Sequence, residues 1–194
     1  IHRIPKVIEE YLYSAMEDYK LDIIIDQGPG ARSVSLQLEK FTLIGSTTRA
    51  GLLSAPLLDR FGIRCRLKYY NVDELADIVN RSAGILKIRI EDEGAMIIAK
   101  RSRGTPRIAN RLLKLTRDLA IVKNKGVITA DIAGESLDNW EIDHLGLDEL
   151  DKKILMTIID TYNGGPVGLN SIAVSVGEEP GTIEEVYEPF LVLE

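Results

Sequence analysis

The chain has 194 residues, of which 45% are hydrophobic and 28% charged, a composition typical of a globular protein. Its formal net charge of −6 argues against a wholly basic nucleic-acid coat protein, although it leaves room for a local basic patch. The single cysteine, Cys65, excludes an intramolecular disulfide, and no apolar run approaches the roughly 18 residues that a membrane span needs, so we expect a cytoplasmic protein with no membrane partner.

Helix and strand patterns alternate over residues 1–71. An apolar helical stripe follows Pro5, a residue favoured in a first helical turn. Two strand-like runs, 21–26 and 33–39, flank a Gly-Pro-Gly turn and predict a long β-hairpin. The elements expected after the hairpin are a buried strand at 41–45, a short helix at 54–61 and a strand at 63–67. Such interleaving favours an α/β sheet layer.

From residue 72 to about residue 143 almost every pattern is helical. Asn71 or Asp73 can cap a first helix, and a second covers about 92–100. The third helix begins near Thr105-Pro106, and its apolar residues are spaced to form one buried face: Ile108, Leu112, Leu115, Leu119 and Val122. A fourth helix covers about 129–137. These patterns predict a four-helix domain over residues 72–145.

The residues from 146 onward predict a DNA-binding module. Gly146 is a hinge after an acidic connector. A helix containing Leu150 then ends at Gly164-Gly165-Pro166, a second short helix starts at Leu169, and a third follows Gly181. This succession is typical of helix-turn-helix and winged-helix modules. We expect the wing to lie beyond the last residue.

The loop after residues 41–45 carries hydroxyl groups and a cation, in Thr47, Thr48 and Arg49, and the next helix ends at Arg60. In motor ATPases, hydroxyls at the tip of a core strand sense the γ-phosphate, and an arginine at the end of the following helix enters a neighbouring subunit's site as an arginine finger. The alternative is that Arg60 is a surface cation at a helix C-terminus, where positive charge is favoured. Its position after the Thr-Thr-Arg loop favours the finger.

Arg107 is a second candidate for a phosphate contact. It follows Pro106 at a predicted helix N-terminus, which favours an anion. Residues 100–125 contain nine basic residues against one acidic residue, Asp118, and such clusters are usually solvated faces. The place of Arg107 at the start of the helix, rather than along its middle, favours the anion site.

The predicted hairpin carries three consecutive isoleucines. Side chains alternate along a strand, so Ile23 and Ile25 share one face and Ile24 takes the other. Either the fold covers both faces, or one face is an exposed apolar surface for a protein partner.

No metal site is predicted. His2 and His144 are far apart in the sequence and no cysteine cluster accompanies them. Glu17 and Asp18 form an acidic pair, but such a pair is more often the exposed end of a helix. The Gly28-Pro29-Gly30 turn lacks the lysine and the hydroxyl residue of a phosphate loop.

Several longer strings together resemble the RuvB family of AAA+ motors, which drive branch migration of Holliday junctions. They run from end to end of the chain in the family's order, and several are chemically arbitrary, which makes the match specific. The strings are Ile1-His2-Arg3, Glu9-Glu10-Tyr11-Leu12-Tyr13, Ala15-Met16-Glu17-Asp18-Tyr19, residues 45–51, Arg60-Phe61-Gly62, residues 101–107, residues 164–169 and Glu188-Pro189-Phe190-Leu191.

This resemblance implies a fold of the α/β plus α class. The expected parts are a portion of an AAA+ sheet domain with a protruding β-hairpin (1–71), a four-helix lid (72–145) and a truncated winged helix (146–194). The resemblance further implies a homo-hexamer that hydrolyses ATP with Mg²⁺ and acts on Holliday junction DNA in recombination and repair. It also implies a partner, the junction-binding protein RuvA.

The resemblance assigns roles to single residues. Thr47 and Thr48 fall at the sensor-1 loop, Arg60 at the arginine finger that acts in trans, and Arg107 at sensor 2 on the lid. The positions that the family associates with the nucleotide are Glu17, Asp18, Tyr19 and Tyr70. Ile23 and Ile25 fall on the hairpin that binds the partner.

Some parts of the family pattern are not in the chain. The phosphate loop and the magnesium-binding Asp-Glu pair would precede Ile1, and the DNA-contacting wing arginines would follow Glu194. We therefore expect a fragment, or the ordered part of a longer chain, that by itself neither hydrolyses ATP nor binds DNA normally. Two alternatives stay open: a non-enzymatic helix-turn-helix regulator whose ATPase-like domain only assembles, and a clamp-loader-type AAA+ subunit.

Overall fold

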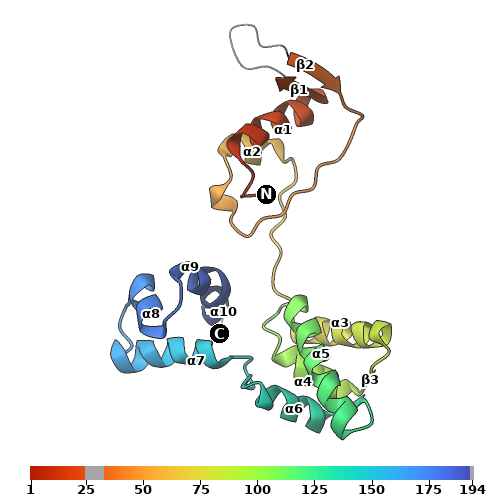
Figure 1. The fold of residues 1–194 in the computed structure, drawn as a ribbon, viewed down its shortest axis with the longest axis vertical. Coiled ribbons are helices and arrows are strands. Elements are labelled where there is room, and N and C mark those ends of the chain that lie inside the picture. The colour runs from red at the N-terminus through yellow and green to blue at the C-terminus, as the bar shows by residue number, and fades with distance from the viewer. Residues whose placement is uncertain (25–32, 193–194) are drawn as a thin grey trace. The chain divides into compact units, whose positions relative to one another are not determined.

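The computed structural model describes residues 1–24 and 33–192, in two compact units, Ile1–Leu67 and Lys68–Glu194 (Figure 1). The described residues are mostly helical, with two small two-stranded sheets. Among these residues, no helix combines the length and the apolar character needed to cross a bilayer. The prediction for Ile25 lies outside the described residues.

The first unit begins with helix α1, Lys6–Asp18. Tyr19 ends this helix in the left-handed conformation, with φ 55°, and the chain enters strand β1, Lys20–Ile24, directly. Strand β1 pairs antiparallel with β2, Ser33–Gln37, which confirms the predicted hairpin (Figure 1).

Helix α2, Ala55–Arg60, confirms the predicted short helix. The Ser54 hydroxyl caps it by accepting a hydrogen bond from the N–H of Leu57 at 3.2 Å. A single 3₁₀ turn, Ala50–Leu52, precedes the helix.

The strands predicted at 41–45 and 63–67 are wrong, because both segments have irregular backbone. A strand needs a hydrogen-bonded neighbour, and among the described residues of this unit only β1 and β2 pair. The side chains that such strands would bury therefore stay open to solvent; the exposed fractions are 88% for Ile44, 85% for Ile63 and 91% for Leu67.

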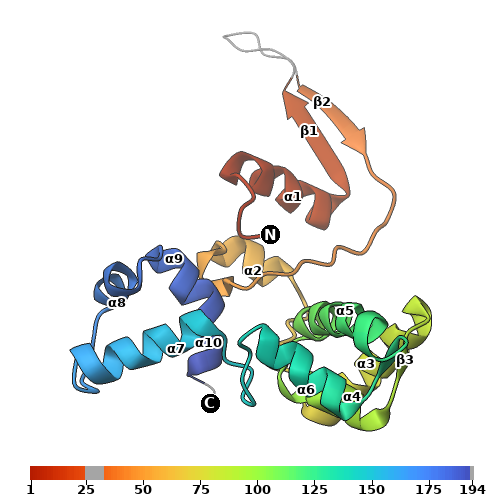
Figure 2. The same cartoon turned by 60° about the horizontal axis from the view of Figure 1, so that its bottom comes forward.

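The second unit starts with the four predicted helices of the lid, drawn in yellow to teal in Figure 2. They are α3 (Val72–Leu86), α4 (Asp92–Lys100), α5 (Pro106–Lys123) and α6 (Ala130–Asn139).

The local capping signals fixed where these helices begin. Asn71 accepts the N–H of Glu74 while the Glu74 carboxylate accepts the N–H of Asn71, and Thr129 caps α6. A short parallel pair, β3 (Arg89–Ile90) with β4 (Val127–Ile128), was not predicted.

The buried face of α5 is only partly as predicted. Leu112 is buried, but Val122 is 82% exposed. The predicted apolar positions drift around the helix over its length. Besides Leu112, the buried residues each lie one position after a predicted one: Ala109, Leu113, Thr116 and Ala120. These side chains join the core that α3, α4 and α6 build around Val79, Ala95, Ile98 and Leu137.

The last part of the second unit is the predicted helical module. Its helices are α7 (Glu149–Met156), which continues as a π-helical stretch at Thr157–Thr161, and α8 (Leu169–Val176). A final helical run comprises α9 (Pro180–Thr182), a π-helical stretch at Ile183–Tyr187 and α10 (Glu188–Leu191). Its own small core contains Ile154, Ile172, Ala173, Val176 and Ile183.

Candidate functional site

The two predicted sensor hydroxyls differ in their surroundings. The Thr47 hydroxyl lies 2.8 Å from Nδ1 of His2 and accepts the N–H of Arg49 at 3.0 Å, so it is half-buried and hydrogen-bonded within the unit. Thr48 is exposed. Of the two, the Thr48 side chain is therefore the more accessible to a ligand.

Arg60, the last residue of α2, folds back onto α1. Its Nη2 is 2.8 Å from Oε1 of Glu17, its Nη1 donates to the Pro56 carbonyl at 2.9 Å, and its Cζ lies 4.3 Å from the centroid of the Tyr13 ring. Within the described part of the chain, the buried Nε has no hydrogen-bond partner. A guanidinium presents five donors in a fixed fork, and this fork keeps an unused donor.

The residues at the end of α1 do not act alike. Glu17 pairs with Arg60, whereas Asp18 is exposed. Tyr19 packs edge-on against Phe41, with 6.0 Å between the ring centroids. An open depression of about 360 Å³ lies here, lined by Met16, Tyr19, Phe41, Leu43, Arg60, Phe61, Gly62 and Ile63.

Tyr70 and Arg107 belong to the second unit. The N–H of Tyr70 donates to the carbonyl of Gly104 at 3.0 Å, three residues before Arg107 in the chain. Gly104 has φ 63°, and a Cβ there would come within 2.6 Å of the Tyr69 Cβ, so only glycine fits this turn. Arg107 is exposed in the first turn of α5, where unpaired N–H groups of the helix favour an anion.

The structure thus brings together two pairs of predicted elements. Arg60 contacts Glu17 in the first unit, and Tyr70 contacts the loop that leads to Arg107 in the second. Ile23 lies on β1, opposite Val34 of β2, and is 42% exposed.

The sequence interpretation missed two neighbours of these residues. Tyr13 forms the face on which the Arg60 guanidinium rests, and no local pattern indicated it. Arg103 was noted only as part of a basic loop, yet it forms ion pairs with Asp148 and Asp151. The Asp148-x-x-Asp151 spacing is a capping-box signal, but it does not reveal a cation 48 residues away in the sequence.

Three sequence models of one family match consecutive parts of the chain. The model of the P-loop domain of the Holliday junction DNA helicase RuvB matches residues 1–67, that of the RuvB AAA lid domain residues 70–143, and that of the RuvB C-terminal winged helix domain residues 144–194. The chain belongs to the RuvB family. The resemblance seen in the sequence is thereby confirmed at the level of the family.

Solved structures of Thermotoga maritima RuvB are similar over the whole chain. The one described as the Holliday junction branch migration motor is 50% identical, with a TM-score of 0.83, and the match covers 100% of this chain and 60% of that one. A point mutant of the same protein is also 50% identical, with a TM-score of 0.85, and that match again covers 100% of this chain and 60% of the other. The chain therefore spans about 60% of the length of the solved relatives it matches.

Proposed function

We propose that this chain belongs to an ATP-driven motor subunit that moves Holliday junctions during recombination and repair. The RuvB domains and the similarity to a branch migration motor support this function. The observation that carries it is Arg60, because its guanidinium ends α2 and forms an ion pair with the exposed carboxylate of Glu17, a partner that a phosphate oxygen can replace.

In this proposal Arg60 acts in trans, as an arginine finger on the nucleotide of a neighbouring copy in a homo-hexamer. Its present partners, Glu17 and Tyr13, hold the guanidinium until the neighbour's γ-phosphate replaces the carboxylate. Glu17 is 56% exposed, and ion pairs of exposed groups contribute only about 0–1 kcal/mol, so the exchange has a low energetic cost. Thr47 and Thr48 act as sensor 1, the hydroxyl groups that sense the γ-phosphate.

Arg107 acts as sensor 2 on the same subunit's nucleotide. The exposed guanidinium and the free N–H groups of the first turn of α5 together favour a phosphate. Asp18, Tyr19 and Tyr70 complete the nucleotide contacts of the proposal.

The described residues are not proposed as ligands of Mg²⁺. They contain no group of three or more His, Cys, Asp or Glu that could hold a metal ion. The roles proposed for the described residues are binding phosphate and stabilising its charge.

Two further partners belong to the proposal. Holliday junction DNA would contact the winged-helix part. RuvA would contact the apolar face of the hairpin, where Ile23 and Val34 lie opposite each other.

The test uses a chimaera in which this chain replaces the matching 60% of Thermotoga maritima RuvB. We expect the chimaera to hydrolyse ATP and to move a synthetic four-way junction. Arg60→Ala should then lower the rate of hydrolysis by roughly 10³ to 10⁵, the range measured for arginine fingers, while ATP binding stays nearly unchanged. Asp59→Asn, a change at an exposed position next to Arg60 on α2, is the matched control and should keep hydrolysis. Equal losses of binding and hydrolysis in Arg60→Ala would place Arg60 in its own subunit's site and refute the trans role.

A further inference from the structure

Arg103 lies in the loop between α4 and α5, and its side chain is only 10% exposed. Its backbone has φ 52°, a left-handed conformation that is uncommon for a residue with a side chain. Such a conformation persists only where the surroundings hold it. One such constraint is Gly104, the next residue, which packs against Tyr69.

The Arg103 side chain contacts three segments of the winged-helix part. Its Nε donates to the Gly146 carbonyl at 2.7 Å, and its Nη2 forms an ion pair with Asp151 and lies 3.2 Å from Oδ2 of Asp148. Its Cζ is 4.9 Å from the centroid of the Phe190 ring, on α10. These five residues are called the Arg103 cluster below.

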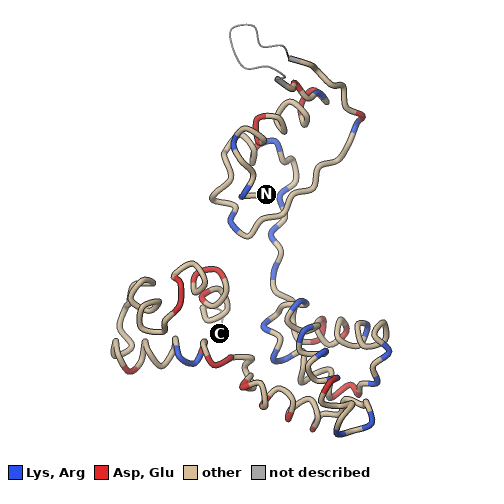
Figure 3. Tube along the Cα trace, in the orientation of Figure 1, with Lys and Arg blue, Asp and Glu red and all other residues tan. Residues whose placement is uncertain are grey.

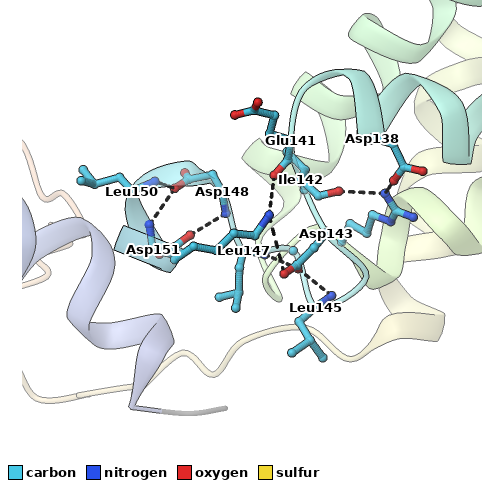
Figure 4. Close-up of polar contacts among 12 residues, drawn as sticks. Asp138, Glu141, Ile142, Asp143, Leu145, Leu147, Asp148, Leu150 and Asp151 are labelled. Atoms are coloured by element: carbon cyan, nitrogen blue, oxygen red, sulfur yellow. Dashed lines mark hydrogen bonds and ion pairs between the residues drawn. The ribbon is translucent and has the colours of Figure 1, made fainter. Parts of the chain in front are cut away.

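The carboxylate that Arg103 meets is fully buried. Asp151 is 0% exposed, and its Oδ2 also accepts the N–H of Asp148 at 2.8 Å. Asp148 in turn accepts the N–H groups of Leu150 and Asp151 at 3.0 and 3.1 Å, so the two aspartates cap α7 (Figure 4). A buried carboxylate that loses its cation is strongly destabilising, so this pairing constrains both segments.

A second set of contacts joins the same loop to the connector, the segment 140–148 between α6 and α7. Nη1 of Arg101 donates to the Ile142 carbonyl at 2.8 Å. Gly146 has φ 85°, and a Cβ at this position would come within 2.8 Å of the Arg101 carbonyl oxygen, so the close approach requires glycine. Nζ of Lys152, on α7, donates to the Glu141 carbonyl at 2.9 Å (Figure 4). The connector is thus hydrogen-bonded on both sides, to the lid loop and to α7.

We propose that the Arg103 cluster fixes the winged-helix part to the lid, so that the two move as one rigid body. Arg103 and Arg107 belong to one short loop and helix start, which Tyr70 also contacts. A phosphate that binds at Arg107 and shifts this loop would therefore displace the DNA-binding part with it. This last consequence rests on the proposed function, whereas the rigid connection does not.

The experiment measures the distance between the two parts by electron paramagnetic resonance. In a Cys65→Ser background, spin labels are attached at Asp131→Cys on α6 and Val174→Cys on α8, both exposed positions. We expect one narrow distance distribution in the parent chain and a distribution at least twice as broad after Arg103→Ala. Arg111→Ala, which removes an exposed arginine of the same lid, is the matched control and should leave the distribution narrow.

A folded Arg103→Ala chain with the narrow parent distribution would overturn the proposal. If circular dichroism shows that the Arg103→Ala chain does not fold, the Arg103→Lys variant tests the proposal in its place. Lysine keeps the charge beside Asp151 but loses the fork that also reaches Gly146, so a broadened distribution supports the proposal and an unchanged one refutes it. The samples contain neither nucleotide nor DNA, so the result is independent of whether the motor function holds.

Discussion

Arg60 and Arg107 are both arginines near a helix terminus, yet their surroundings differ. Arg60 makes an ion pair, a hydrogen bond to a carbonyl and a contact with an aromatic ring, all within its own unit. Arg107 is exposed at the start of α5. The first is therefore pre-oriented by its own unit, while the side chain of the second is open to solvent.

Replacing Arg107 should weaken nucleotide binding. A hydrogen bond to a charged group contributes about 1.5–3 kcal/mol, so Arg107→Ala should lower the affinity of the chimaera for a fluorescent ATP analogue by roughly ten- to a hundredfold. Arg111→Ala, one turn further along the exposed face of α5, is the control and should bind as the parent does. Equal affinities of the Arg107→Ala and parent proteins in this titration would remove Arg107 from the nucleotide site.

The hairpin has one apolar face. The register places Leu21 opposite Leu36 and Ile23 opposite Val34, so these four side chains share a face, while Asp22 and Ser35 pair on the other. Three of the four are more than 40% exposed: Ile23, Val34 and Leu36. A two-stranded hairpin with such a face gains stability by burying it against a partner.

Polar residues on this face should abolish RuvA binding without affecting the fold. Burial of one large apolar side chain contributes about 1.5–3 kcal/mol, so Ile23→Ser with Val34→Ser should weaken binding of the chimaera to RuvA by at least roughly a hundredfold. Asp22→Ser, on the opposite face, is the control and should bind normally. If the double variant instead unfolds in a thermal melt, the face belongs to a core and the partner hypothesis fails.

Helix α7 begins at two aspartates, the buried Asp151 and the half-buried Asp148, and the titration of Asp151 follows from its burial. Burial raises the pKa of Asp151 to about 6, although the Asp148 N–H and the Arg103 guanidinium act in the opposite direction. Tyr187 interacts with the same charges. Burial raises its pKa, as do the negative charges of Asp148, Asp151 and Glu178, while Arg103 lowers it.

This shift predicts a pH dependence of stability. The pKa of Asp151 is about 6 in the folded chain and 3.8, its ordinary value, in the unfolded chain. Between these values the folded chain binds more protons than the unfolded one, so the free energy of unfolding should fall as pH rises from about 4 to about 6. Asp151→Asn removes this titration, and its stability should change less over the same window. Urea unfolding at several pH values, followed by fluorescence of the single tryptophan, Trp140, measures the difference. Equal slopes for both chains would show that Asp151 titrates normally.

Much of the architecture was predictable because its signals are local. The Asn71–Glu74 capping box, Pro106 in a first turn and the alternating hairpin strands each act within a few residues, and the structure has these elements where expected. The strands at 41–45 and 63–67 were not predictable in the same way, because a strand depends on neighbours that the described residues do not supply.

The site was predictable as a set of residue types but not as a set of contacts. The family pattern indicated Arg60 and Glu17 separately, whereas their ion pair depends on how α2 packs on α1. The same holds for Arg103 and Asp151, which lie 48 residues apart in the chain. Pairings of this kind are decided by tertiary packing, which propensity and spacing do not encode.

The two units are linked by a segment that a protease should find first. Residues 62–68 have irregular backbone and are exposed, and they include three sites for trypsin, Arg64, Arg66 and Lys68. Figure 3 draws the basic residues of this segment in blue. Lid and winged helix, by contrast, lie in one compact unit that begins at Lys68. A segment with few buried contacts and an exposed backbone needs little free energy to open locally, and a protease cuts first where local opening is easiest.

Brief digestion with trypsin should therefore accumulate a product that begins at Tyr69 and contains both the lid and the winged-helix part. Basic residues within folded helices, such as Lys114 on α5, should be cut later although they are exposed, because cleavage there requires the helix to unfold. Mass spectrometry of the time course identifies the product. Arg103→Ala should shift the pattern toward cuts after Arg101 and Lys152, since the contacts that join the lid loop, the connector and α7 are then weakened. Early cleavage at those two sites in the unchanged chain would contradict the single compact unit.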